Sequence, residues 1–459
     1  MFTAAELVEA LGPALLDPPS GAHRDLRFAR VVVDSREAGP GALFVALAGE
    51  RTDGHRFIPD AIERGATGIL AKGWLDESLT DQRQAALFRV ADPLAALQTM
   101  ARRRRERLSP RVVGVTGSVG KTSTKDAIAG VLSQRYRVLK SGGNRNTEIG
   151  LPLTLLGIEP EHERLVLEMG MYQLGDIAAL CRIARPQVGV VTNVGPTHLA
   201  RLGSIDRIAA AKAELVESLP PDGYAVLNAD DPMVALFGSR TAAAVITFGL
   251  SPDADCRATA VESRGLNGLS FSISWRREAA TVRTPLLGKH HVSTALAAAA
   301  VGFGEGLSLD EVTAGLEGLS SGGRLRVRRG INGSTLLDDS YNASPVSMKA
   351  ALDLLHETPG RHIAVLGDML ELGSEEEAGH REVGRHAAAR ADCLFAIGDR
   401  AFGMAAAARD AGMRCVRHFQ SPAQAGDALA PALGPHQYVL LKGSRTMALD
   451  LLADELSEA

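Results

Sequence analysis

RVVGVTGSVGKTSTKD, residues 111–126, joins three kinds of segment in a telling order. RVVGVT is typical of a buried strand, GSVG of a tight turn, and KTSTKDAIAGVLSQ, residues 121–134, of a helix. A glycine-rich turn and a helix N-terminus present backbone N–H groups to phosphate oxygens, while a lysine neutralises charge and a threonine hydroxyl can coordinate Mg²⁺. The stretch therefore predicts a nucleotide phosphate loop with Lys121 and Thr122 as contacts.

The glycine spacing of this loop departs from the usual phosphate-loop formula. That formula places its first glycine at Val115, whereas the chain has glycines at 114, 117 and 120. A glycine-rich turn without a ligand is the alternative. The loop also leaves the reaction open, because switches, motors, kinases and ligases share it. The Asn-Lys-x-Asp guanine-reading motif of GTPases is absent from the sequence.

Strand-like runs continue on both sides of the loop and predict an α/β fold with three domains. Residues 1–88 form a small α/β domain, residues 89–318 a central domain with a mostly parallel sheet, and residues 319–459 a C-terminal Rossmann-like domain. Residues 89–109 form the helix that connects the first two. LSFSISW, residues 269–275, alternates with a two-residue period and is expected to be an antiparallel edge strand or part of a hairpin.

Four consecutive arginines, residues 102–105, occur in the predicted connecting helix. A basic run of this kind can indicate a nucleic-acid partner. Successive helical residues point in different directions, however, so we expect a solvated face.

The composition and net charge of the chain argue against two kinds of partner, nucleic acids and membranes. The chain has 459 residues, a formal net charge of −4 and 4% aromatic residues. So few aromatic residues argue against a base-stacking nucleic-acid platform, and so small a net charge provides no general field for DNA or a membrane. The sequence contains no apolar run that could span a bilayer and no secretory signal pattern at its start. We therefore expect a cytoplasmic protein without nucleic-acid binding or membrane insertion.

The four cysteines, Cys181, Cys256, Cys393 and Cys415, are far apart and form no Cys-x-x-Cys pair. This spacing suggests neither a disulfide framework nor a zinc site. We expect buried free thiols in a reducing compartment.

Polar residues follow the predicted central strands, where open α/β sheets place their sites. Glu168 ends one strand, and Asn193 and His198 follow the next. A carboxylate and an imidazole there could complete a Mg²⁺ shell begun by Thr122. Taken singly, each has an ordinary alternative, a solvent contact for Glu168 and a structural role for His198. Lys212 lies among alanines on a predicted helix, where an exposed lysine is the default.

The order of motifs resembles the Mur ligase family, ATP-dependent amide-forming enzymes that assemble the peptide of bacterial cell-wall precursors. The resemblance runs nearly end to end and is carried by GVTGSVGKTSTKD, GNRNTEIGLP, LEMG, NVGPTHL, AKAE, GGRLRV, DDSYNASP, LGDMLELG and KGSR. In that family the loop is written Gly-x-Thr-Gly-x-x-Gly-Lys-Thr, which accounts for the glycine spacing. DDSYNASP and GDMLELG most resemble the branch that joins D-alanyl-D-alanine to UDP-N-acetylmuramoyl-tripeptide through an acyl phosphate.

The resemblance implies roles for individual residues. Catalysis would involve Lys121, Lys212, His198 and Arg324. ATP would be bound by Gly117, Ser118, Val119, Gly120, Lys121, Thr122, Ser123, Thr294, Arg324, Asp339 and Asn342. The uridine-nucleotide substrate would be bound by Ser35, Arg36, Asp53, Gly54, His55, Phe57, Asn144, Asn146 and Thr147. The Mg²⁺ ligands would be Thr122, Glu168, His198 and Lys212, the last as a carbamate formed with CO₂.

Two residue assignments stay open within the resemblance. His291 and Thr294 stand where the family usually has asparagines, one of which contacts adenine. Lys442 and Arg445 of KGSR could pair with the carboxylate of the dipeptide or have a structural role.

The third-residue-adding ligases usually carry Asp-Asn-Pro-Arg, which this chain lacks, and the uridine-type N-terminal segment disfavours the folate ligases. A nucleotide-driven switch is the alternative from another class. The expected oligomeric state is a monomer.

Overall fold

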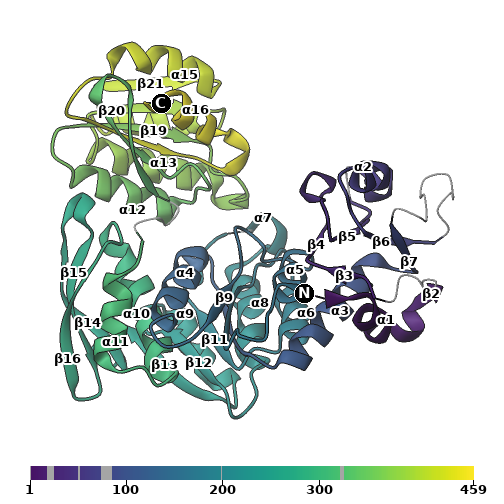
Figure 1. The fold of residues 1–459 in the computed structure, drawn as a ribbon. Helices are drawn as coiled ribbons and strands as arrows, with labels where there is room; N and C mark the ends of the chain where they lie inside the picture. Colours follow the sequence, from purple (N-terminus) through teal and green to yellow (C-terminus); the bar gives the residue numbers. More distant parts are fainter. Residues whose placement is uncertain are drawn as a thin grey trace. The chain divides into compact units, whose positions relative to one another are not determined.

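The computed structural model describes residues 2–17, 25–49, 52–73, 85–197, 199–320 and 325–458. The chain divides into two compact units. The first comprises residues 1–114, 136–170 and 176–187, and the second comprises residues 115–135, 171–175 and 188–459. Helices and strands alternate in both (Figure 1), which confirms the α/β class. In the described ranges, every helix is too short or too polar to cross a lipid bilayer.

The N-terminal part of the first unit is a five-stranded sheet in the order β2-β7-β6-β5-β4. Its strands are β2 (Leu15–Asp17), β4 (Arg30–Val32), β5 (Ala42–Val45), β6 (Gly68–Lys72) and β7 (Ala86–Val90). All neighbours are parallel except β2, which is antiparallel to β7. Helix α2 (Ile58–Glu63) packs Ile58 and Ala61 against Phe44 and Ile69 of the sheet. Strands β1 (Phe2–Thr3) and β3 (Arg27–Phe28) form a separate antiparallel pair beside α1 (Ala4–Leu11).

The rest of the first unit belongs to the central α/β region. Its elements are α3 (Pro93–Leu108), β8 (Arg111–Thr116), β9 (Val138–Lys140), α5 (Gly150–Leu156), β10 (Arg164–Glu168) and α6 (Asp176–Ala184). Strand β8 lies beside β10, and β10 is parallel to β9. Helix α3 begins after Asp92, whose carboxylate accepts hydrogen bonds from the N–H groups of Leu94 and Ala95 and so caps the helix.

The expected solvated face of α3 includes Arg102 and Arg103, but the other two arginines of the run are buried. Arg104 and Arg105 are each 7% exposed. Arg104 donates two hydrogen bonds to the Ile158 carbonyl, and Arg105 donates to the carbonyls of Ala184 and Arg185. Carbonyls beyond a helix end lack intrahelical donors, so a guanidinium can satisfy several of them at once. These two arginines therefore tie α3 to the ends of α5 and α6.

The second unit contains six strands in the order β16-β15-β14-β13-β12-β11. The strands are β11 (Val188–Val191), β12 (Tyr224–Asn228), β13 (Ala244–Gly249), β14 (Cys256–Ser263), β15 (Leu269–Trp275) and β16 (Glu278–Thr284). The helices are α4 (Lys121–Leu132), α7 (Leu199–Leu202), α8 (Ile205–Glu217), α9 (Pro232–Ala235), α10 (Val292–Gly304) and α11 (Leu309–Glu317). Strands β11 to β14 are parallel, as predicted. Strand β15 forms a hairpin with β16, as expected, but the edge strand is β16.

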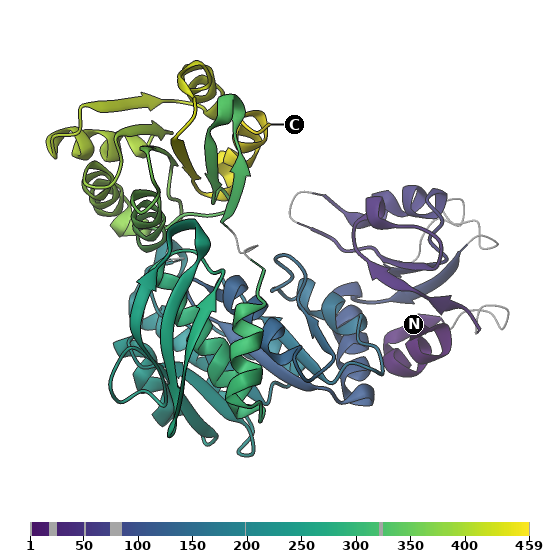
Figure 2. The ribbon, with the colours of Figure 1, turned by 60° about the vertical axis from the view of Figure 1, so that its left-hand side comes forward.

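The C-terminal part of the second unit is a six-stranded sheet in the order β17-β18-β22-β19-β20-β21. Its strands are β17 (Arg326–Arg329), β18 (Thr335–Asp338), β19 (Arg361–Gly367), β20 (Cys393–Ile397), β21 (Cys415–Phe419) and β22 (Gln437–Lys442). Only β17 is antiparallel to its neighbour. Helices cover both faces (Figures 1 and 2): α12 (Pro345–His356), α13 (Glu376–Ala388) and α14 (Ala401–Asp410) on one, and α15 (Pro422–Leu429) and α16 (Leu449–Glu455) on the other. This arrangement matches the expected Rossmann-like layering.

The prediction of four free thiols is half wrong. Cys181 and Cys256 are free and buried, but Cys393 and Cys415 form a disulfide. The two residues are 22 positions apart in sequence, yet they open the neighbouring parallel strands β20 and β21 directly opposite each other. Sequence spacing could not reveal the pairing, because the sheet register brings the two cysteines together.

Candidate active site

The phosphate loop, residues 117–123, lies between the end of β8 and the first turn of α4. Gly120 caps α4 with φ of 84° and ψ of 0°, a left-handed conformation that glycine adopts without steric cost. Gly117 has φ of 152°, and a Cβ there would come within 1.9 Å of the Thr192 Oγ1 atom. Both glycines are thus required by the backbone, which explains their positions in the sequence.

Asn193 clamps the phosphate loop from the end of β11. Its Oδ1 accepts from the Val119 N–H at 2.9 Å, its Nδ2 donates to the Val119 carbonyl at 2.9 Å, and its backbone carbonyl accepts from the Ser118 N–H at 3.0 Å. The Thr192 hydroxyl also donates to the Val119 carbonyl, at 2.7 Å. The Ser118 hydroxyl exchanges hydrogen bonds with the backbone of Gly195. The loop is therefore held in one shape by the following strand end.

A second layer of polar residues supports this clamp. Asn228, at the end of β12, donates from Nδ2 to the Thr192 carbonyl at 2.8 Å. The Asp231 carboxylate accepts from the Val194 N–H at 2.8 Å. Sequence reasoning noted Asn193 only as a strand-end residue and missed Thr192, Asn228 and Asp231. The available signal was the polar residue at the end of each successive parallel strand.

Lys121 and Thr122 open α4. The Lys121 ammonium donates to the carbonyls of Gly117 at 2.7 Å and Ser118 at 3.3 Å. The lysine thus folds back over the loop and places a positive charge beside the N–H groups at the helix N-terminus. Both features attract a negatively charged phosphate. Thr122 and Ser123 are half-buried in the same first turn.

Lys212 is buried on α8, so the default of an exposed lysine is wrong. The residue is 2% exposed. Burial, together with the charge of Lys121, holds the pKa of the Lys212 ammonium well below its usual value. A lowered pKa favours the unprotonated amine, which is the form of lysine that acts as a nucleophile.

In the first unit, the buried Glu168 forms a polar pair with the half-buried Asn146. Glu168 ends β10 with 0% exposure, so it is no solvent contact. The Asn146 Nδ2 donates to the Glu168 Oε1 at 2.8 Å, and the Glu168 N–H donates to the Ser141 hydroxyl at 3.2 Å. The Asn146 carbonyl also accepts from the Gly170 N–H. The loop that carries Asn146 is thereby fixed to both sides of Glu168.

The two neighbours of Asn146 in the candidate substrate loop differ in exposure. Asn144 is exposed, and its carbonyl accepts from the Asn146 N–H at 2.8 Å. Thr147 is half-buried and precedes α5, where its hydroxyl accepts from the Gly150 N–H at 3.4 Å. Asn144 is therefore the one of the two whose side chain is open to a ligand.

The candidate uridine-nucleotide residues Ser35 and Arg36 lie in a short 3-10 turn after β4. The Arg36 side chain is 81% exposed and pairs with Asp34, with Nη2 2.6 Å from Oδ2. A hydrogen bond from Ser35 lowers the pKa of Asp60. Because its side chain is so exposed, the Arg36 guanidinium is available to a ligand from solvent. Ser35, in contrast, is buried, with 7% exposure.

Asp53, Gly54, His55 and Phe57 lie in a second short turn, residues 53–57. Asp53 Oδ1 accepts from the His55 N–H at 3.0 Å and contacts His55 Nδ1 at 2.6 Å, while the Lys72 N–H donates to His55 Nε2. The hydrogen bonds from the backbone and the side chain of His55 lower the pKa of Asp53. Gly54 approaches the backbone of Leu47 too closely for a side chain. Among these four, Phe57, at 42% exposure, presents an open apolar surface.

The C-terminal candidates Asp339 and Asn342 lie in the loop after β18. The Lys442 ammonium, at the end of β22, donates to Asp339 Oδ2 at 2.5 Å and to the Asn342 carbonyl at 3.0 Å. Lys442 is 3% exposed, so its position fits the structural role that the sequence left open. Arg445 is exposed and donates from Nη1 to the Tyr341 hydroxyl at 3.2 Å, with its guanidinium 5.3 Å from the ring centre.

Thr294 is 6% exposed in the first turn of α10, and His291 is half-buried just before that helix. The His291 Nδ1 lies 2.6 Å from the Leu287 carbonyl. Burial lowers the pKa of His291, which favours the neutral ring. A neutral imidazole both donates and accepts hydrogen bonds, as the replaced asparagine would.

Two predicted site residues, His198 and Arg324, lie outside the described residues. The phosphate loop, Lys212, Thr294, Asp339 and Asn342 belong to the second unit, whereas Glu168, Asn146 and the nucleotide-binding candidates of the N-terminal sheet belong to the first. Across the ranges that the structure describes, no cluster of three or more His, Cys, Asp and Glu side chains could hold a metal ion by itself.

Comparisons with known proteins cover nearly the whole chain. Three family models match: "Mur ligase family, catalytic domain" over residues 27–105, "Mur ligase middle domain" over residues 115–302 and "Mur ligase, glutamate ligase domain" over residues 323–445. The UDP-N-acetylmuramoyl-tripeptide--D-alanyl-D-alanine ligase of Bacillus subtilis (strain 168) is 38% identical over 94% of this chain and 93% of its own length.

Two solved structures are similar along their full length. A crystal structure of MurF from Acinetobacter baumannii matches with a TM-score of 0.86 and 29% identity, covering 99% of this chain and 98% of that one. The MurF ligase from Thermotoga maritima in complex with ADP matches with a TM-score of 0.80 and 30% identity, covering 94% and 97%. Family models, sequence identity and fold agree, and the chain therefore belongs to the Mur ligase family.

Proposed function

We propose that this protein joins D-alanyl-D-alanine to UDP-N-acetylmuramoyl-tripeptide at the expense of ATP, releasing ADP and phosphate. The observation that carries the proposal is the phosphate loop with Lys121 folded over it, together with Lys212, whose pKa is lowered by burial and by the Lys121 charge. The near full-length likeness to ligases of this name supports the choice of substrates.

The reaction requires activation, because a carboxylate at neutral pH does not react with an amine. The tripeptide carboxylate attacks the γ-phosphorus of ATP, the bond to the β,γ-bridging oxygen breaks, and an acyl phosphate forms with ADP. The dipeptide amine then attacks the acyl carbon, loses a proton, and expels phosphate to leave an amide. Lys121 and the N–H groups at the start of α4 compensate the charge that develops on the transferring oxygens. Arg324 is our candidate for a further positive charge there.

Each candidate ATP contact has a stated task. Residues 117–123 hold the phosphates, Asp339 and Asn342 lie along the nucleotide, and Thr294 contacts the adenine region. Lys442 supports this assignment because it fixes both Asp339 and the Asn342 backbone in one loop conformation.

The residues present fit a Mg²⁺ site of the kind that nucleotide enzymes use. Mg²⁺ is usually bound by one or two carboxylates together with substrate phosphates and water, so a dense ligand cluster is unnecessary. Thr122, Glu168 and His198 would hold it, and when bound it neutralises phosphate charge. Asn146 orients the Glu168 carboxylate through the 2.8 Å hydrogen bond.

Lys212 acts in this proposal as a carbamate. Its unprotonated amine attacks the carbon of CO₂, a C–N bond forms, and one proton is lost to solvent, so that a neutral side chain becomes an anion. Burial and the neighbouring Lys121 lower the pKa of the Lys212 amine, which favours the form that attacks CO₂. The product anion would also pair with the positive charge of Lys121.

The substrate contacts that we propose combine exposed side chains with residues that shape the loops around them. The Arg36 guanidinium and the Phe57 ring suit the diphosphate and uracil of the nucleotide, with Ser35, Asp53, Gly54 and His55 shaping the two turns. Asn144, Asn146 and Thr147 face the muramoyl group and the phosphates. The protein would act as a monomer in the cytoplasm, where nucleotide-linked precursors are made.

A nucleotide-driven switch is the competing function, and phosphate release separates the two. The assay contains ATP, Mg²⁺ and UDP-N-acetylmuramoyl-tripeptide, with and without D-alanyl-D-alanine. A ligase releases phosphate in proportion to the dipeptide consumed, and Lys121→Ala abolishes the release. Release that is indifferent to D-alanyl-D-alanine would favour a switch and reject the proposal.

A further inference from the structure

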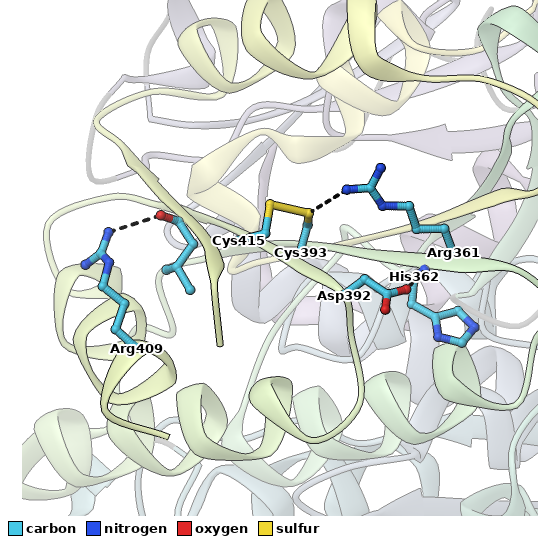
Figure 3. The surroundings of a disulfide bond; sticks show 7 residues. Arg361, His362, Asp392, Cys393, Arg409 and Cys415 are labelled. Carbon is cyan, nitrogen blue, oxygen red and sulfur yellow. Dashed lines mark hydrogen bonds between the residues drawn. A yellow bond between two sulfur atoms is a disulfide. The ribbon is translucent and has the colours of Figure 1, made fainter. Parts of the chain in front are cut away.

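The disulfide between Cys393 and Cys415 is the strongest chemical feature outside the candidate active site. It bridges the first residues of β20 and β21 (Figure 3). The Cα atoms of the two cysteines are 4.7 Å apart. The loops that carry Asp339 and Asn342 follow the opposite, carboxyl ends of strands in the same sheet. The bridge therefore has no place in the ligase chemistry proposed above.

The two sulfur atoms have different surroundings. Cys393 is 3% exposed and packs in the core on the α15 and α16 side of the sheet, whereas Cys415 is half-buried on the edge strand β21. A small thiol in solution therefore reaches Cys415 more readily than Cys393. Thiol attack on a disulfide depends on such access as well as on the leaving sulfur.

A positively charged guanidinium lies beside the buried sulfur of Cys393. The Arg361 Nη2 donates to the Cys393 Sγ at 3.3 Å, as the dashed line in Figure 3 marks. The adjacent carboxylate of Asp392 accepts from the His362 N–H at 2.7 Å, so part of its charge is already compensated. A guanidinium beside a sulfur stabilises the thiolate that forms when the S–S bond breaks, and a stabilised thiolate leaves faster.

From this asymmetry we propose that Cys393–Cys415 is a reversible thiol–disulfide exchange site with a fixed order of attack. The thiolate of a small thiol attacks Cys415 Sγ, the S–S bond breaks, and Cys393 leaves as a thiolate beside Arg361. A second thiol attacks the mixed disulfide and releases the oxidised small disulfide, leaving the two protein thiols reduced. Two thiols are oxidised for each protein disulfide reduced, and a small disulfide such as oxidised glutathione reverses the exchange.

The site would control the edge of the C-terminal sheet. Strand β21 pairs only with β20 in the described part of this sheet. The backbone hydrogen bonds to β20 and the disulfide therefore both attach β21 to the sheet. Reduction removes that covalent link and loosens the edge strand without touching the phosphate loop. Hydrogen exchange at residues 415–419 therefore quickens on reduction.

The test uses the purified full chain and reduced glutathione without oxygen. Samples quenched with acid and alkylated are mapped by mass spectrometry, and the rate of disulfide loss is measured. We expect the transient glutathione adduct on Cys415. We also expect Arg361→Gln to slow reduction about fivefold, the factor that corresponds to losing one exposed charge contact.

Arg409→Gln is the matched control. The Arg409 Nη2 donates to the Val416 carbonyl at 3.2 Å, on the same edge strand but away from the sulfurs (Figure 3), so its rate should equal that of the unaltered protein. An adduct on Cys393, equal rates for Arg361→Gln and Arg409→Gln, or no disulfide after treatment with oxidised glutathione would each overturn the proposal. These readouts are independent of ligase activity, so their failure is distinct from a failure of the proposed function.

Discussion

Asn193 and Val119 form a two-point hydrogen-bonded pair, with the Asn193 amide accepting from the Val119 N–H and donating to the Val119 carbonyl, both at 2.9 Å. One side chain thus fixes both polar groups of a single peptide position in the phosphate loop. Since the Val119 N–H already has a partner, the positive end of α4 and Lys121 are left to attract the phosphates. The hydrogen bonds from the end of β11 thus hold the loop in the shape seen here.

Removing this pair should weaken nucleotide binding. Asn193→Ala removes two hydrogen bonds and lets the loop sample other shapes, so we expect the Kd for ADP to rise about tenfold. Titration calorimetry measures it, with the exposed residue Asn267 changed to Ala as the control. An Asn193→Ala protein that binds ADP as tightly as the control would show that the clamp does not prepare the site.

The Asn146 amide should act on the metal more than on the nucleotide. Asn146→Ala removes the donor to Glu168 Oε1, so the buried carboxylate loses its orientation. We expect Mn²⁺, used as a spectroscopic substitute for Mg²⁺, to bind about tenfold more weakly in the presence of ADP. Asn144→Ala, in the same loop, should keep its Mn²⁺ affinity. Equal loss in both variants would assign the effect to the loop as a whole.

Lys212 gives a prediction with a defined pH dependence. Its pKa in the folded protein is lowered, so the unfolded chain takes up a proton that the folded chain does not, and the free energy of unfolding falls as pH falls from about 10.4 toward the folded value. In CO₂-free buffer, the Tm advantage of Lys212→Met over the unaltered protein should therefore grow on acidification. A constant Tm difference would contradict the lowered pKa.

The carbamate itself is tested by activity. Lys212→Ala should lose most ligase activity and recover part of it when a short carboxylate such as formate or acetate is added, because the small anion can replace the carbamate. Removal of CO₂ should lower the activity of the unaltered protein alone. A Lys212→Ala variant with ordinary activity would reject the role.

Arg105 should matter for stability. Arg105→Met leaves the Ala184 and Arg185 carbonyls without the donor that α3 supplies, and we expect the free energy of unfolding to fall by about 2–3 kcal/mol. Arg103→Met is the control, because that side chain is 61% exposed and forms an i,i+3 ion pair, worth less than about 1 kcal/mol. Urea unfolding compares them, and equal losses would contradict the burial argument.

The sequence predicted the features that depend on local pattern. RVVGVT followed by GSVG and KTSTKD gave the strand, turn and helix of the phosphate loop, and the glycines at 117 and 120 were placed where the backbone needs them. Glu168 was placed at the end of its strand for the same reason. Such features follow from the residues of one segment and are readable in order.

What the sequence could not predict depends on contacts between distant segments. Arg104 and Arg105 are buried because the ends of two other helices lie against α3, and Cys393 meets Cys415 because of a sheet register. The burial of Lys212 likewise comes from elements around α8, while its Ala-rich neighbours only permit it. The Asn193 clamp was visible as a strand-end residue, but its partner was not.

The most direct test of the central claim is a mass measurement on a reaction with ¹⁸O in the tripeptide carboxylate. The account predicts a UDP-N-acetylmuramoyl-pentapeptide whose mass equals the sum of the labelled tripeptide substrate and the dipeptide less one H₂¹⁸O, formed together with phosphate that carries one ¹⁸O from the carboxylate. No pentapeptide, or phosphate that carries no ¹⁸O, would contradict ligation through an acyl phosphate.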